Sequence, residues 1–392
     1  MMNILWIVTK CLDISVSRVS RIEMLKSLET LGHNMMLVTG FKKKKLWFGL
    51  DGKIKYIPLI NVKILNVFIF YLYLLFYVGY KIFNKRIDFV IADPGSFWAM
   101  AVLAVLRKIK MLNAKFILDI RTVPVEVFGI SGKIKEKLFN ISILGAKYLF
   151  DGITVITPFM KKVLTDRYGL SKSNMSVWSS GASLDQFDPN QFNPEHIEAL
   201  KEQLNLKDKF VIMYHGVLTT TRGLPEAIKA LSLLSNEHSD IAFFIMGDGI
   251  AKVELENVTN RLELQNRVII KDAVPYEEIP KYIALADVGI LPFPPILWWR
   301  VSSPIKLMEY LAMEKPVIVT DIEAHKQVIG RNPCGFYVNS NNPESIARGI
   351  VEAYMKKDRL KEIGQQGRKL IQDKYSWAKQ ASQLEKYLKS IY

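Results

Sequence analysis

The sequence has almost no cysteine, no signal-peptide segment and no excess of acidic residues. Its two cysteines, Cys11 and Cys334, lie far apart in the 392 residues. Two isolated cysteines exclude a disulfide framework and a zinc-ligand spacing, which is typical of proteins in a reducing compartment. The apolar start, residues 1–10, lacks the long hydrophobic region of a signal peptide. We therefore expect a globular protein of the cytoplasm.

The composition predicts two folded domains of unequal charge. Apolar residues make up 49% of the chain and charged residues 23%, which is the balance of a globular protein. A chain of 392 residues exceeds one typical core, so two domains of roughly 150–200 residues each are expected. The net charge of +15 lies entirely in residues 1–185, which hold 27 Lys and Arg against 12 Asp and Glu. This half carries no nucleic-acid recognition motif, so an anionic membrane surface is the favoured partner.

Two segments of the first half bear on that membrane prediction. Residues 42–45 are four lysines, followed at once by Leu46, Trp47 and Phe48. Lysines beside aromatic residues suit an anionic lipid interface, although a solvated loop would have the same sequence. Residues 64–80 carry no charge over 17 positions and are flanked by lysines. Three interpretations of this segment compete. A helix that lies in the membrane plane or is partly buried is favoured over a buried core helix, and a transmembrane span is the least favoured.

Strands and helices alternate along the whole chain, which predicts an α/β fold with two doubly wound domains. Apolar strands are predicted at residues 4–8, 34–39, 88–92, 115–119, 152–157, 175–178, 210–215, 241–246, 268–271, 288–292 and 316–320. Unbroken apolar strands indicate parallel sheets covered on both faces. The seam is residues 179–194, which are rich in Ser, Asp, Asn and Pro. We place the domains at residues 1–185, completed by 376–392, and at residues 186–375.

The segment 302–321 is the strongest candidate for a binding site. Ser302, Ser303 and Pro304 predict a helix start, with a serine oxygen as cap and proline at the first helical position. Lys306 falls in the first turn, where the helix dipole disfavours a cation unless an anion also binds there. Glu309 shares a helix face with Lys306. The segment therefore predicts a nucleotide clamp, and the alternative is a surface ion pair between these two residues.

Two glycine-containing loops follow strands in the same half. Residues 216–223 run from Gly216 to Arg222 and Gly223, where glycine lets the backbone approach a ligand and arginine can bind phosphate. The loop lacks the Gly-Lys-Ser/Thr ending of a Walker A motif, and the alternative is a hydroxyl-rich turn. Residues 247–249 (Gly-Asp-Gly) follow the next strand. Ligands bind beyond the carboxyl ends of the strands in such domains, so these loops predict one wall of a cleft.

These motifs resemble those of GT-B glycosyltransferases of the retaining family 4, the glycosyl transferases group 1 family. The similar segments appear in the family's order over nearly the whole chain, at residues 32–39, 181–189, 215–223, 246–249, 286–288, 306–317 and 375–377. The resemblance implies two Rossmann-like domains facing across a cleft, with a C-terminal helix that crosses back to the first domain. It also implies a first domain that binds the acceptor and a second that binds the nucleotide sugar.

The resemblance implies roles for individual residues. Arg222 and Lys306 would hold the donor diphosphate and act as catalytic groups, and Glu309 would bind the ribose hydroxyls. Further donor-binding positions would be Gly216, Gly223, Gly247, Val274 and Ser303. On the first domain Asp119 and Arg121 follow a strand and would orient the acceptor or meet the diphosphate, the alternative being a strand-end ion pair. Asp13, Ser15 and Arg18 would lie on the acceptor side.

Three positions depart from the family's pattern. Val217 stands where an arginine is common, and Val301 stands where the first of two glutamates would contact the donor sugar. The first loop, residues 10–20, lacks the usual Gly-Gly.

The implied function is transfer of a sugar, with retention, from a UDP- or GDP-linked donor to a lipid-linked or growing glycan acceptor at the inner face of the cell membrane. No cofactor and no nucleic acid are expected. No metal is expected either, since no Asp-x-Asp pair is present. An epimerase or hydrolase on the same fold and a non-catalytic membrane or glycan-binding scaffold are the alternatives.

Overall fold

The computed structural model divides the chain into two compact units. It describes residues 1–9, 18–41, 52–58, 63–84, 86–124, 129–234 and 238–392. Unit 1 comprises Met1–Ser179 with Trp377–Tyr392, and unit 2 comprises Ser180–Ser376. Asp13, Ser15 and the lysine run 42–45 lie outside the described residues.

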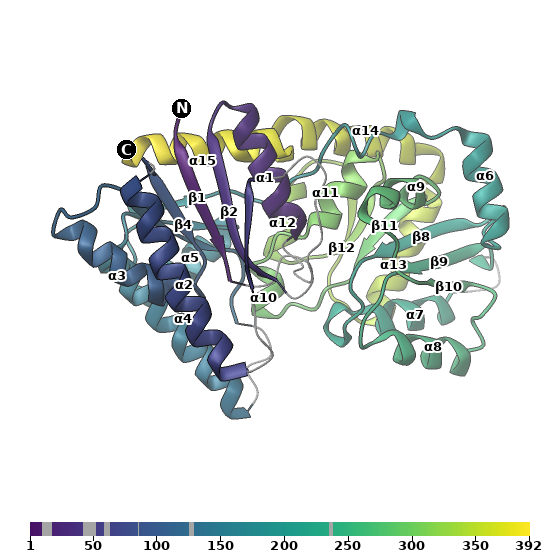
Figure 1. Ribbon diagram of the computed structural model, residues 1–392. Coiled ribbons are helices and arrows are strands. Elements are labelled where there is room, and N and C mark those ends of the chain that lie inside the picture. The colour runs from purple at the N-terminus through teal and green to yellow at the C-terminus, as the bar shows by residue number, and fades with distance from the viewer. Residues whose placement is uncertain (10–17, 42–51, 59–62, 85, 125–128, 235–237) are drawn as a thin grey trace. The chain divides into compact units, whose positions relative to one another are not determined.

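Unit 1 is built on a parallel sheet of seven strands (Figure 1). The strand order is β3-β2-β1-β4-β5-β6-β7. The strands are β1 (Asn3–Val8), β2 (Asn34–Phe41), β3 (Ile54–Pro58), β4 (Phe89–Ala92), β5 (Lys115–Ile120), β6 (Gly152–Val155) and β7 (Met175–Val177). The helices are α1 (Arg18–Thr30), α2 (Lys63–Asn84), α3 (Phe97–Lys108), α4 (Gly129–Leu149), α5 (Pro158–Tyr168) and α15 (Trp377–Ile391), with a short 3-10 helix at Lys172–Asn174. The central strands β1, β4 and β5 are buried along almost their full length, as the unbroken apolar strands predicted.

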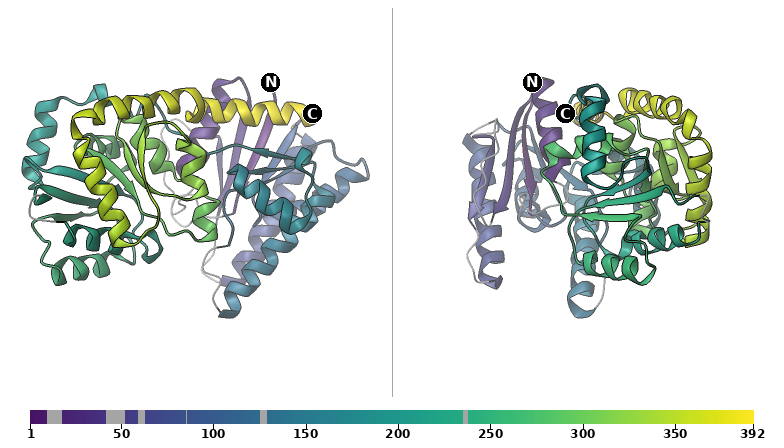
Figure 2. Two further views of the ribbon diagram at one scale, coloured as in Figure 1. Left: turned by 180° about the vertical axis from the view of Figure 1, so that it is seen from behind. Right: turned by 90° about the vertical axis from the view of Figure 1, so that its right-hand side faces the viewer.

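The C-terminal helix α15 belongs to unit 1, although the whole of unit 2 precedes it in the sequence. Trp377, Leu384 and Leu388 are buried in the same apolar cluster as Trp6 of β1. Asp88 accepts hydrogen bonds from the amide of Asn3 (2.7 Å) and from the hydroxyl of Tyr392 (3.4 Å), so the two chain ends lie close together, as both views of Figure 2 show. The predicted return of the last helix to the first domain is confirmed.

Helix α2 contains the uncharged segment 64–80. Phe70, Leu74 and Val78 are buried, whereas Phe76 and Tyr80 on the other side of the same helix are exposed. Among the described residues, no helix combines the length and the apolar composition that a membrane span requires.

Unit 2 has a parallel sheet of six strands in the order β10-β9-β8-β11-β12-β13. The strands are β8 (Phe210–His215), β9 (Ile241–Met246), β10 (Val268–Lys271), β11 (Val288–Leu291), β12 (Val317–Thr320) and β13 (Gly335–Val338). The helices are α6 (Pro194–Gln203), α7 (Leu224–Ser232), α8 (Lys252–Arg261), α9 (Ile279–Ala284), α10 (Leu297–Arg300), α11 (Ile305–Ala312), α12 (Glu323–Ile329), α13 (Pro343–Met355) and α14 (Leu360–Leu370), and a π-helical turn follows at Ile371–Tyr375. Short 3-10 helices lie at Pro189–Gln191, Thr220–Arg222, Tyr276–Glu278 and Lys357–Arg359.

The position of α11 on this sheet is set by Tyr310. A Cβ on Gly289 of β11 would lie 2.5 Å from the Tyr310 ring, so only glycine lets the ring pack flat against the strand. The Tyr310 hydroxyl donates to the carbonyl of Met213 (3.0 Å) and accepts from the amide of His215 (3.1 Å), both on β8. These contacts hold the first turn of α11 beside the carboxyl end of β8.

Candidate functional site

The N-terminus of α11 differs in one respect from the sequence-based expectation. Pro304 is the capping residue, not the first helical residue, and no side-chain hydrogen bond caps it. The Ser302 hydroxyl donates to the Trp299 carbonyl (2.7 Å), and the Ser303 hydroxyl accepts from the amide of Ser180 (3.1 Å). The predicted serine cap is therefore wrong, because both hydroxyls bond to neighbouring segments. The start of α11 is left without a side-chain oxygen in the place where a ligand oxygen would bind.

The loop after β8 lies directly against Lys306. Gly216 has a φ of +114°, and a Cβ there would come 3.2 Å from Cε and 3.3 Å from Nζ of Lys306. Gly247, after β9, packs against the same loop, since a Cβ on Gly247 would lie 1.9 Å from the Gly216 carbonyl oxygen. The two predicted glycine loops are thus stacked on one another, and the Lys306 ammonium group lies at their edge.

Arg222 and Lys306 form a pair of cations around one aromatic ring. The Arg222 guanidinium lies 5.7 Å and the Lys306 ammonium 5.9 Å from the centre of the Phe293 ring. Arg222 also stacks on Trp299 at 4.8 Å, and Lys306 lies 5.1 Å from the Tyr214 ring. The pKa of Lys306 is well below its ordinary value, because of burial first and repulsion by Arg222 second.

This pair has no carboxylate partner among the residues that the structure describes. Arg222 is 8% exposed, and its buried Nε has no hydrogen-bond partner. The acidic group that acts on Lys306 is Glu309, but it ranks behind burial and Arg222 in its effect on the Lys306 pKa. Two neighbouring cations without a counter-ion are costly in a folded protein, so the arrangement favours an anionic ligand of more than one charge.

Glu309 is not part of a surface ion pair. Its side chain is buried, with a relative exposure of 2%, and its Oε1 accepts from the Tyr276 hydroxyl at 2.8 Å. The ring nitrogen Nε2 of His215 lies 3.3 Å from Oε2 without hydrogen-bond geometry. Burial raises the pKa of Glu309 to about 7. The pKa of His215 is well below its usual value, through burial and then the charges of Lys306 and Arg222, so this histidine is neutral.

The remaining predicted donor-binding residues lie in neighbouring loops of unit 2. Gly223 has a φ of +71°, and a Cβ there would be 2.0 Å from the Pro292 carbonyl oxygen, so the loop can close on β11 only with glycine. Val274 follows β10 and is half-buried, and the amide of Ala273 donates to Asp248 (3.3 Å) in the Gly-Asp-Gly turn. The contact of Val274 with a nucleotide base stays a prediction.

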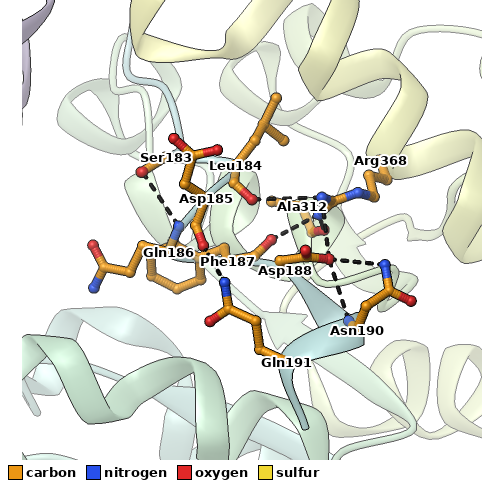
Figure 3. A network of polar contacts seen from close by, with 10 residues as sticks. All are labelled: Ser183, Leu184, Asp185, Gln186, Phe187, Asp188, Asn190, Gln191, Ala312 and Arg368. Atoms are coloured by element: carbon orange, nitrogen blue, oxygen red, sulfur yellow. Dashed lines mark hydrogen bonds and ion pairs between the residues drawn. The ribbon is translucent and has the colours of Figure 1, made fainter.

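Part of the seam, residues 184–188, is held by an arginine that the sequence analysis missed. Arg368 of α14 donates to the carbonyls of Phe187 (2.7 Å) and Ala312 (2.5 Å) and pairs with Asp188 at 3.4 Å (Figure 3). Ala312 is the last residue of α11. Arg368 therefore ties the loop at residues 184–188 to the far end of the helix that carries Lys306 and Glu309.

That loop in turn supports Tyr276. The Phe187 ring lies 5.7 Å from the Tyr276 ring, and the Gln186 amide donates to the Tyr276 carbonyl at 3.2 Å. Tyr276 then donates its hydroxyl to Glu309. Tyr276 was also missed, because the sequence shows no pattern that links residue 276 to residue 309.

We expect Arg368→Ala to lower the free energy of unfolding of unit 2 by roughly 2–3 kcal/mol, because several carbonyl oxygens would lose their donor. Urea unfolding followed by tryptophan fluorescence measures the change. Arg359→Ala is the matched control: Arg359 is exposed and pairs only with Glu362 in the described structure, so its loss should change stability by less than about 0.5 kcal/mol. Equal effects of the two substitutions would contradict the role assigned to Arg368.

In unit 1, Asp119 is fully buried and engaged by three donors. It pairs with Arg21 of α1 and accepts from the Thr154 hydroxyl (2.8 Å) and the Trp178 indole nitrogen (3.1 Å). Arg21 was not identified from the sequence, because it lies 98 residues away in the chain. The contacts match the strand-end ion pair that was the alternative for Asp119. A direct contact of Asp119 with substrate stays a prediction.

Arg121 lies over the Trp178 ring at 3.3 Å and donates to the Trp178 carbonyl at 2.6 Å. Burial lowers its pKa to about 9, an effect that the nearby Asp119 opposes. Within the part of the chain that the structure describes, its buried Nη2 has no hydrogen-bond partner, so this donor is open to a ligand. Arg18, assigned to the acceptor side, is the first residue of α1.

Known proteins resemble the chain in sequence and in fold. Residues 196–370 match the family model "Glycosyl transferases group 1". A putative glycosyltransferase of Bacillus subtilis, YtcC, is 23% identical over 268 residues, which are 66% of this chain and 62% of that protein. The aligned part of the chain thus spans less than two thirds of that relative.

Solved structures match the whole chain. A glycosyltransferase from Rickettsia africae is 23% identical, with a TM-score of 0.78 over 100% of this chain and 98% of the other. Anabaena Alr3699/HepE, solved in complex with UDP-glucose, is 14% identical, with a TM-score of 0.76 over the full length of both chains. The predicted fold is confirmed: both units are Rossmann-like and the chain has the GT-B fold.

Proposed function

We propose that the protein is a glycosyltransferase that moves a sugar from a nucleotide-sugar donor to a lipid-linked or growing glycan acceptor. The observation that carries the proposal is the pair Arg222 and Lys306, which has no counter-ion among the described residues and lies beside the buried carboxylate of Glu309. Two cations suit a diphosphate, and a carboxylate near them suits the two ribose hydroxyls. The segment that matches the glycosyl transferases group 1 model holds all three residues.

The chemistry requires a stabilised leaving group. As the bond between the sugar and the phosphate breaks, negative charge grows on the departing diphosphate, and Arg222, Lys306 and the open N-terminus of α11 would stabilise it. We propose transfer with retention, in which the leaving phosphate oxygen accepts the proton of the acceptor hydroxyl. Under this mechanism no separate general base is needed. Arg121 of unit 1 would orient the acceptor through its unpaired Nη2.

The acceptor and the location are proposed from the first half of the chain. Its net charge of +15 and its aromatic and apolar segments favour binding to an anionic membrane surface. Such a location suits an acceptor that is linked to a lipid. We propose that the protein is peripheral at the inner face of the cell membrane and takes part in synthesis of cell-surface polysaccharide or glycolipid.

The proposal is tested by binding and then by turnover. Purified protein is heated with UDP, GDP or ADP, and we expect one of them to raise the melting temperature, with no such rise in Lys306→Ala. The corresponding nucleotide sugars are then assayed for nucleotide release with and without lipid-linked acceptors. Acceptor-dependent release is the expected result. Acceptor-independent hydrolysis or epimerisation would replace the proposal by another activity, and the absence of any nucleotide binding would refute it.

A further inference from the structure

Three consecutive helices of unit 1 each expose a line of large apolar side chains. On α2 these are Phe68, Leu72, Phe76, Tyr80 and Phe83, with exposed fractions of 42–69%. On α3 they are Trp98, Val102 and Val105, continued by Ile109 directly after the helix, and on α4 they are Ile130, Ile134, Leu138, Ile141, Leu144 and Tyr148. The spacing of three and four residues places each line on one side of its helix. The opposite sides are buried against the unit, as Leu74, Leu103 and Ile143 show.

The three lines belong to one surface, because the helices are packed side by side with α3 in contact with both α2 and α4 (Figure 1). Small residues bring the helices together. A Cβ on Gly145 of α4 would lie 2.3 Å from the Phe97 ring of α3, and a Cβ on Gly79 of α2 would lie 3.6 Å from Leu103. We call this surface the three-helix face and define it by the fifteen exposed apolar residues given above.

The three-helix face is unlike the described surface of unit 2. Exposed large apolar residues of unit 2 lie singly or in pairs, for example Ile250 with Val253, and Met355. Single exposed apolar residues are ordinary, whereas a contiguous apolar surface of this extent marks a binding surface.

The charges on the same helices indicate what binds there. Lys and Arg number two on α2, two on α3 and four on α4, and the acidic residue on these helices is Glu136. Lys133, Lys135 and Lys137 are exposed and flank the apolar line of α4 on both sides. A second copy of the chain would bring the same cations against each other, which disfavours a symmetric dimer through this face. Anionic lipid headgroups would complement the cations, and the aromatic residues suit the boundary between headgroups and acyl chains.

We propose that α2, α3 and α4 together dock unit 1 on an anionic lipid bilayer, with the fifteen apolar side chains entering the headgroup region and the flanking lysines on lipid phosphates. The inference deepens the proposed function, since it names the surface that would meet the membrane of a lipid-linked acceptor. It places the contact on a layer of three packed helices that covers the sheet. A single inserted helix is not required.

The test measures lipid binding without nucleotide or acceptor, so its outcome is independent of the transfer reaction. The full chain is floated with vesicles of phosphatidylcholine alone and of phosphatidylcholine with about 30% phosphatidylglycerol. We expect binding to the anionic vesicles that falls at high salt, and a loss of about tenfold or more in the double variant Ile134→Glu/Leu138→Glu. The matched control, Ile250→Glu/Val253→Glu, changes exposed residues of unit 2 and should float like the unchanged protein.

Two further readouts keep the outcome unambiguous. The melting temperature without ligand should be close to that of the unchanged protein in both double variants, which shows that each has folded. Trp98 lies on the face, so part of the shift of tryptophan emission to shorter wavelength on vesicle addition should disappear in Trp98→Phe. Undiminished flotation of Ile134→Glu/Leu138→Glu would overturn the proposal. So would a dimer in light scattering that this variant dissociates, combined with no vesicle binding by either protein.

Discussion

Replacing Lys306 by alanine is expected to lower the rate of sugar transfer by roughly 10²–10³-fold, the usual cost of losing one preorganised charge at a developing anion. The reason is the position of its ammonium group at the edge of the Gly216 loop and beside Arg222, where no acidic residue of the described structure pairs with it. Because burial and Arg222 disfavour the charged form of Lys306, its removal should not reduce the stability of unit 2. The measurements are nucleotide release under single-turnover conditions and the melting temperature without ligand.

The control for this substitution is another buried lysine of the same unit. Lys315 donates to the Ala284 carbonyl (2.9 Å), and its pKa is lowered to about 8 by burial, with Asp287 acting in the opposite direction. Lys315→Ala should therefore destabilise the fold and leave the turnover of folded enzyme nearly unchanged. If Lys306→Ala instead destabilises the fold and transfers sugar at the original rate, the ammonium group is structural and the assigned role fails.

Replacing Glu309 by glutamine is expected to stabilise the empty protein at alkaline pH and to weaken nucleotide binding. The Glu309 pKa is raised from 4.5 to about 7 in the folded protein, so the folded state holds a proton that the unfolded state releases between these values. The contribution of this group to stability is therefore present at pH 4 and is lost as the pH rises to 7, by an amount of the order of 3 kcal/mol. Glutamine cannot ionise, so the free energy of unfolding of Glu309→Gln should exceed that of the unchanged protein at pH 8. At pH 4 the two values should be the same.

The functional cost of Glu309→Gln should appear in the same samples. An amide accepts hydrogen bonds more weakly than a carboxylate, so the nucleotide should bind about 10–100-fold more weakly. Glu323→Gln provides a control for the sign of the pH effect. The pKa of Glu323 is lowered by its pairing with Arg300, so this pair stabilises the fold increasingly as the pH rises through the acidic range. The stability lost in Glu323→Gln should therefore grow over that range and stay constant above pH 6. A stability difference for Glu309→Gln that does not change between pH 4 and pH 8 would show that the raised pKa is wrong.

The fold was predictable because its strongest signals are local. β8, β9 and β11 are short apolar runs that are buried over their whole length, and bounding them in the sequence required only this local pattern. The edge strands β3 and β13 were not predicted, since β3 is short and contains a lysine and a proline, and β13 includes glycine and partly exposed residues. The short α10 escaped detection, because four residues give no measurable period.

The candidate site was predicted in part. Lys306 and Glu309 were identified from a predicted helix start, and Arg222 and Gly216 from a loop at the end of a strand; the structure places Gly216 and Arg222 beside Lys306 near the start of α11. The supporting residues were not identified, because Tyr276, Arg368 and Arg21 act through contacts with residues that are 33 to 181 positions away. Such contacts leave no periodic or spacing signal in one sequence.

The sequence by itself determined which segments become strands, where the glycines must be and which charged residues stand at strand ends, because propensity, periodicity and backbone freedom act over a few neighbouring residues. Only the tertiary structure decided how those residues are paired. It showed that Ser302 and Ser303 bond elsewhere and leave the start of α11 uncapped, and that Arg222 and Lys306 share one aromatic ring. It also showed that three separate apolar lines form one face of unit 1. Pairing, burial and the resulting pKa values depend on distances between segments remote in the chain, which are set when the sheets and helices pack.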